Sequence, residues 1–197
     1  MKIPRLELSF GQLAWTLCMG QAPSAHVKNR LNYLRQLGIP FERAERARGS
    51  GNRIAYAYED LLECGVGLFA LEVGMKPKDI QAILVERRTV MQKIFRRALR
   101  EQPEAALTSP WVKSRGRIGV LMGTEIFLRL HDRYSSRPGA VEVITPGDAP
   151  ISFATLFDPI ERLPDGNVVR LAPLTRLALQ WVAWALEAPV IRTGPRG

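Results

Sequence analysis

Helix start and stop signals recur in the first hundred residues and divide this region into a series of separate helices. Ser9 precedes an apolar stripe and has Gln12 three residues later, the spacing of a capping box. After an intervening glycine and proline, Ser24 is suited to cap a second helix, which Gly38 would end. We therefore expect one helix from about Ser9 and another over residues 24–37.

The stretch from residue 41 to residue 58 has a different pattern. Gly49-Ser50-Gly51-Asn52 is a turn signal, and Ile54 and Tyr56 alternate with other residues after it. The sequence therefore predicts a short basic β-hairpin, or wing, over residues 43–56. The arginines around its turn are Arg43, Arg46, Arg48 and Arg53.

Two further helices are expected before residue 102. One covers about residues 59–73 and ends at Gly74, and the other begins near Pro77 and continues to about Arg100. Apolar residues of the second helix recur at spacings of three and four, which is typical of a helix–helix seam. We expect this seam to form a homodimer, and the alternative is that the helix packs on its own subunit. The seam residues would be Ile80, Ile83, Leu84, Met91, Ile94 and Phe95.

The second half of the chain reads as a small α+β unit. Residues 102–117 are rich in proline, serine and glycine and make the best domain boundary. Short strands are expected at 118–121, 125–130, 141–144 and 168–171, followed by a closing helix over 174–187. The predicted fold class is thus α+β. It divides into a winged helix–turn–helix at 1–75, a linking helix at 76–102 and an interaction or sensing domain at 115–197.

The positive charge of the chain is concentrated in its first half. The 197 residues carry a formal net charge of +9. Residues 1–100 contain 17 Lys/Arg and 9 Asp/Glu, and residues 101–197 contain 11 and 10. A polyanionic partner is therefore expected to bind the first half.

The second predicted helix presents a polar face that is suited to reading DNA. If Val27, Leu31 and Leu34 face the core, a step of 100° per residue turns a row of amide side chains outward. Asn and Gln can bond the adenine edge through two hydrogen bonds, and a lysine can reach guanine. The predicted base contacts are Lys28, Asn29, Asn32 and Gln36. The predicted backbone contacts are Ser24, Tyr33, Arg35, Arg43, Arg46, Arg48 and Arg53. The alternative is an ordinary solvated helix face.

Several elements in order resemble the winged helix–turn–helix of the MerR family of bacterial transcription regulators. After the two helices come the segment 51–56, the acidic helix start Tyr58-Glu59-Asp60-Leu61, and the segment 73–80 with its glycine before the next helix. The resemblance covers residues 8–85. Arg53 stands one residue before the family's Arg-x-Tyr position, which Ile54 occupies.

The resemblance implies a sequence-specific regulator that binds double-stranded DNA, with helix 24–37 in the major groove and the wing on the backbone. The resemblance does not extend to the C-terminal part, which would contact the transcription machinery, another regulator, a ligand or a second subunit. Two alternatives stay open: a protein-interaction adaptor that uses the same basic surface, and an enzyme with its site in the second half.

Catalytic, metal and membrane motifs are missing from the sequence. It has no phosphate-binding glycine loop, nucleophile elbow or His-Glu-x-x-His motif, so we expect no catalytic residues, no metal and no cofactor. Cys18 and Cys64 lie in apolar helices, where a buried and inert thiol is expected. No apolar run is long enough to cross a membrane and no signal-peptide pattern is present, so we expect a cytoplasmic protein.

Overall fold

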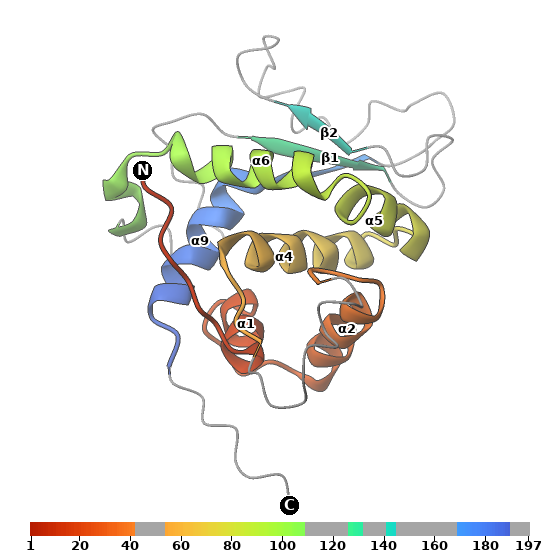
Figure 1. The fold of residues 1–197 in the computed structure, drawn as a ribbon, viewed down its shortest axis with the longest axis horizontal. Helices are drawn as coiled ribbons and strands as arrows, with labels where there is room; N and C mark the ends of the chain where they lie inside the picture. The colour runs from red at the N-terminus through yellow and green to blue at the C-terminus, as the bar shows by residue number, and fades with distance from the viewer. Residues whose placement is uncertain (42–53, 109–125, 132–140, 145–168, 190–197) are drawn as a thin grey trace, which may run out of the picture.

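The computed structural model describes residues 1–41, 54–108, 126–131, 141–144 and 169–189. Its helices are α1 (Phe10–Leu17), α2 (Ala25–Gln36), α4 (Tyr58–Glu72), α5 (Pro77–Leu84), α6 (Arg88–Arg100) and α9 (Leu174–Leu186). A short 3₁₀ helix, η1 (Glu104–Thr108), follows α6. Helix α4 lies at the centre, with α1 and α2 on one side of it and α5 and α6 on the other (Figure 1).

The local start signals of the first two helices are confirmed. The Ser9 side chain accepts a hydrogen bond from the Gln12 backbone, and the Gln12 side chain accepts one from the Ser9 backbone, which completes the capping box. Ser24 caps α2 through its hydroxyl, which accepts from the Val27 amide at 3.3 Å. Gly38 follows α2 with a φ of +91°, a conformation that favours glycine.

The predicted α+β fold with a β wing is wrong, because six α-helices form the body of the part of the chain that the structure describes. Tyr56, at the end of the predicted wing, forms an isolated antiparallel bridge with Leu8 just before α1. Tyr56 is almost fully buried and Ile54 is partly buried against the same core, so their alternation reflects insertion into the helical core. The wing residues 43–53 lie outside the described residues.

The predicted single helix from Pro77 to Arg100 is also wrong. The chain breaks between α5, which ends at Leu84, and α6, which begins at Arg88. Helices α5 and α6 both contact α4, and they also contact each other. The break therefore lets the apolar sides of two shorter helices cover the same central helix.

Three short strands form a small antiparallel sheet in the order β2-β1-β3: β1 (Phe127–His131), β2 (Val141–Ile144) and β3 (Val169–Pro173). Phe127 of β1 is opposite Ile144 of β2 and Pro173 of β3. The Ile126 amide donates to Thr175 Oγ1 at 3.0 Å, and the Leu174 amide donates to the Ile126 carbonyl at 2.8 Å. These bonds attach β1 to the start of α9.

Helix α9 shares the core of the N-terminal helices. It contacts α1, α4 and α6, and Trp184 meets Trp15 edge to face with ring centroids 5.5 Å apart. Trp181 lies directly on Gly65 of α4, where an added Cβ would stand 2.3 Å from the indole ring. The start of the chain and its C-terminal helix thus depend on one hydrophobic core.

Replacing Gly65 with alanine should destabilise the protein by about 1–3 kcal/mol, because the new methyl group overlaps the Trp181 ring. Urea unfolding monitored by circular dichroism measures the change. Gly67→Ala is the matched control, since its Cβ would meet the flexible end of Leu34 at 3.0 Å. Trp181→Phe should recover part of the loss in the double variant. Equal stability of Gly65→Ala and Gly67→Ala would contradict the close approach.

Candidate nucleic-acid interface

Helix α2 presents the predicted row of polar side chains to solvent. Lys28, Asn29, Asn32 and Gln36 are exposed, whereas Leu31 and Leu34 are buried. The predicted outward orientation of this row is confirmed. From residue 28 to residue 36 the helix rises by about 12 Å, similar to the width of the major groove of B-DNA. We call these four exposed residues the α2 outer face.

The α2 outer face belongs to a stretch of sequence without acidic residues. No aspartate or glutamate occurs between Glu7 and Glu42, so α1, α2 and their connection contain cationic but no anionic side chains. Lys28 has no ion-pair partner within the part of the chain that the structure describes. A phosphate or a base edge approaching α2 would therefore meet a free ammonium group and no nearby carboxylate on the same helix pair.

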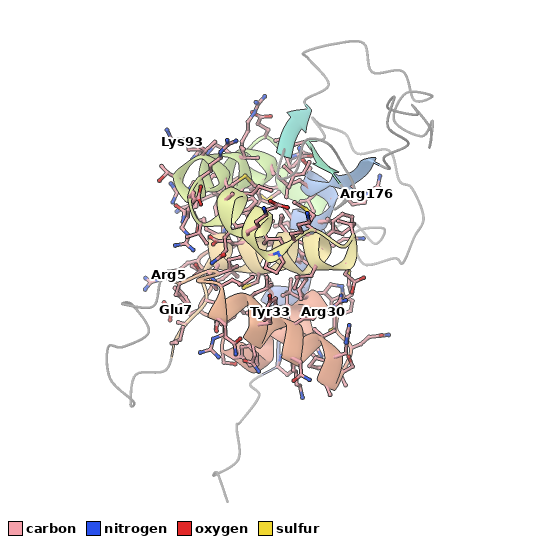
Figure 2. All side chains as sticks on the ribbon, turned by 90° about the vertical axis from the view of Figure 1, so that its right-hand side faces the viewer. Arg5, Glu7, Arg30, Tyr33, Lys93 and Arg176 are labelled. Carbon is pink, nitrogen blue, oxygen red and sulfur yellow. The ribbon has the colours of Figure 1, made fainter. Side chains whose placement is uncertain are left out.

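Other predicted contact residues on α2 have structural roles. Ser24 caps the helix, as described above. The Arg35 guanidinium lies 5.5 Å from the centroid of the Phe10 ring and is half-buried there, so it stabilises the packing of α1 and α2. Tyr33 is 38% exposed beside the α2 outer face (Figure 2). Arg43, Arg46, Arg48 and Arg53 lie outside the described residues.

The predicted dimer seam is covered within the chain. Five of its residues are buried, and Ile94 is partly buried and packed against the same core. The buried residues are Ile80, Ile83, Leu84, Met91 and Phe95. The apolar spacing that indicated a second subunit is therefore explained by packing within one subunit.

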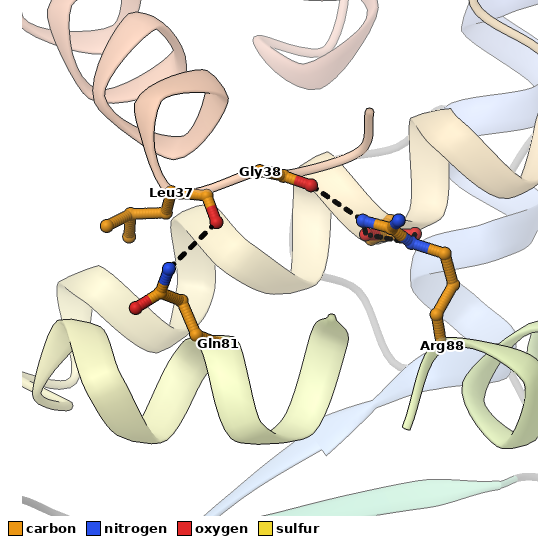
Figure 3. A network of polar contacts seen from close by, with 5 residues as sticks. Leu37, Gly38, Gln81 and Arg88 are labelled. Carbon is orange, nitrogen blue, oxygen red and sulfur yellow. Dashed lines mark hydrogen bonds and ion pairs between the residues drawn. The ribbon is translucent and has the colours of Figure 1, made fainter. Parts of the chain in front are cut away.

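Three long-range polar contacts hold α2, and the local sequence pattern gave no signal for them. In the middle of the helix, Arg30 forms an ion pair with Glu72 at the end of α4, with 2.5 Å between Nη1 and Oε1. At its C-terminal end, the Gln81 amide donates to the Leu37 carbonyl at 3.0 Å. Arg88 donates to the Gly38 carbonyl at 2.6 Å (Figure 3).

Arg88 also forms the most deeply buried ion pair among the described residues. Its guanidinium contacts Glu63 through both Nε and Nη2, with a shortest distance of 2.8 Å. The Glu63 side chain is 2% exposed and that of Arg88 is 17% exposed. The first residue of α6 thereby joins a buried carboxylate of α4 to the carbonyl that follows α2.

The connection between α1 and α2 departs from a short helix–turn–helix. It runs from Cys18 to Ser24, and Met19 and Gly20 both have positive φ angles there. A helix–turn–helix typically has three or four residues at this place. The ring of Trp184 packs against Gly20, so α9 supports this longer connection.

Both cysteines have raised pKa values. Burial raises the pKa of Cys64 well above its ordinary value, and neighbouring Glu63 raises it further. Burial also raises the pKa of Cys18. Both thiols are therefore protonated at neutral pH, and this favours a packing role for them.

The comparisons with known proteins give no neighbour for this arrangement. No protein-family model matches the chain, and neither the curated proteins nor the solved structures searched contain a match. Within the described residues, no helix has the length and apolar character needed to cross a membrane.

Replacing Arg88 with methionine should destabilise the protein by about 3 kcal/mol, because it leaves the Glu63 carboxylate buried without its guanidinium. Arg5→Met is the control, since the Arg5–Glu7 pair is exposed and its loss should change stability little. Chemical unfolding of both variants measures the difference. An effect of Arg88→Met no larger than that of Arg5→Met would contradict the role of the buried pair.

Proposed function

We propose that the protein binds double-stranded DNA sequence-specifically and regulates transcription, with α2 as the element that enters the major groove. The observation that carries the proposal is the α2 outer face: three amide side chains and one lysine on a single exposed stripe. A helix that needed only to be solvated would gain more from strong helix formers than from two asparagines.

The charge distribution supports the same proposal. The pair α1 and α2 contains no acidic residue of its own, and the Glu72 carboxylate of α4 that touches α2 is paired with Arg30. Lys28 can contact a phosphate or a guanine edge, and Asn29, Asn32 and Gln36 can each offer a donor and an acceptor to adenine. A phosphate contact of Lys28 would supply affinity, and the amide side chains would supply base selection.

The attachment of α2 to the rest of the protein also supports the proposal that α2 reads bases. Base readout requires side chains that are held on a fixed scaffold, because small displacements break paired hydrogen bonds. The contacts of Arg30, Gln81 and Arg88 fix the middle and the C-terminal end of α2 on α4, α5 and α6. A solvated surface helix would not need three such attachments.

Replacing Asn32 with alanine should weaken binding to a selected site by about 1–3 kcal/mol and leave binding to random DNA unchanged. The site is first selected from a randomised duplex library with the unmodified protein, and affinities are then measured by fluorescence anisotropy. Gln92→Ala, which removes an amide from α6 on the other side of α4, serves as the control. Equal losses on selected and random DNA would argue against base reading by Asn32.

Replacing Lys28 with glutamine should reduce the dependence of log affinity on log salt concentration by about one unit, because one phosphate contact is lost. Titrations at several salt concentrations measure this slope. Lys78→Gln removes an exposed charge from α5 and should leave the slope unchanged. If both variants keep the slope of the unmodified protein, Lys28 does not contact phosphate. If neither variant nor the unmodified protein binds any duplex, the adaptor alternative is favoured.

A further inference from the structure

Helix α6 has a second basic surface that the proposed DNA contact does not use. Four of its cationic side chains, Lys93, Arg96, Arg97 and Arg100, are exposed and surround a shallow hollow of about 410 Å³ that Glu101 borders. We call these four residues the α6 basic face. Along the helix axis they span about 10 Å, which is two helical turns.

Two of the guanidinium groups on this face are held in place by carboxylates. Arg96 Nε donates to Glu59 Oε1 at 2.6 Å, and Arg97 Nε donates to Glu101 Oε1 at 2.8 Å. These bonds use Nε and leave the outer nitrogens able to meet another anion. Lys93 and Arg100 have no ion-pair partner among the described residues. The face therefore combines oriented and free cations.

The α6 basic face is remote from the α2 outer face. Helix α4 lies between α2 and α6 in both views of the molecule, and Lys93 is on the far side from Tyr33 (Figures 1 and 2). A straight duplex seated on α2 would not reach Lys93. The α6 basic face therefore needs an occupant of its own, and the inference does not rest on the proposed DNA binding.

The residues around the face favour a short acidic protein segment over a nucleic acid. Glu86 precedes the cationic stretch and Glu101 follows it, so a phosphate backbone running along α6 would pass over a carboxylate at either end. Val90 is 56% exposed one turn before Lys93 and offers an apolar contact. The exposed residues of α6 include no aromatic side chain on which a base could stack.

We infer that the α6 basic face binds an acidic amphipathic helix of a partner protein. Glutamates spaced at i, i+4 and i+7 on an antiparallel partner would meet Arg100, the Arg96–Arg97 pair and Lys93 in turn. A leucine one turn further would cover Val90. Charge complementarity determines the partner's chemistry, and the two carboxylates that flank the face limit its length.

The test uses a fluorescent 14-residue alanine-rich peptide with glutamates at i, i+4 and i+7 and leucine at i+11, titrated with the full chain. Lys93→Gln combined with Arg100→Gln should raise the Kd about five- to tenfold, the effect of two exposed ion pairs. Lys76→Gln combined with Lys78→Gln is the matched control, because it removes two exposed charges outside the face. Raising the salt concentration should weaken the peptide complex.

Three outcomes would overturn the inference. The first is no saturable binding of the peptide, or equal binding of a peptide whose glutamates are spread around the helix. The second is an equal loss in the control double variant. The third is tighter binding of a single-stranded oligonucleotide to the same residues, which would assign the face to nucleic acid.

Discussion

The buried ion pair between Arg88 and Glu63 is the contact on which the arrangement of the helices depends. A carboxylate as deeply buried as Glu63 is costly unless it is paired, and Arg88 is its ion-pair partner. The same guanidinium donates to the Gly38 carbonyl beyond the end of α2. Arg88 is the first residue of α6, so both contacts are made at the point where the chain separates α5 from α6. One side chain therefore links the positions of α2, α4 and α6.

Another part of the core, which includes Gly65 of α4, is held by the fit of side chains instead of by charge. Trp181 fills the space that Gly65 leaves on α4, and Trp184 packs against Trp15 and Gly20. Helix α9, almost at the end of the described chain, thus holds the connection that leads into α2. The buried charge and the tryptophans together keep α2 against the body with its polar side outward. This fixed presentation is what a helix that reads bases would need.

Contacts that are local in sequence could be predicted, and contacts that are distant could not. The capping box of Ser9 and Gln12 spans three residues, so the sequence contains everything that determines it. Arg88 meets groups that are 25 and 50 residues away, and no periodicity reveals such a pairing. At Tyr56, the described end of the predicted wing, alternation has two physical causes, pairing in a hairpin and burial in a helical core, and the described residues show burial in the core. The seam prediction failed for a similar reason, since a helix covered by its own chain has the same apolar spacing as one in a dimer.

For the candidate site, the direction of the α2 side chains followed from helix geometry, whereas the role of Arg35 beside Phe10 depended on how α1 packs.

The most direct measurement of the central claim, that α2 is a fixed DNA-reading helix, is the chemical-shift change of each backbone and side-chain amide when a selected duplex is added to isotopically labelled protein. We predict the largest changes for residues 28–36, including the side-chain amides of Asn29, Asn32 and Gln36, with little change along α6. Changes concentrated on the α6 basic face, or an unperturbed α2 in a saturated complex, would contradict it.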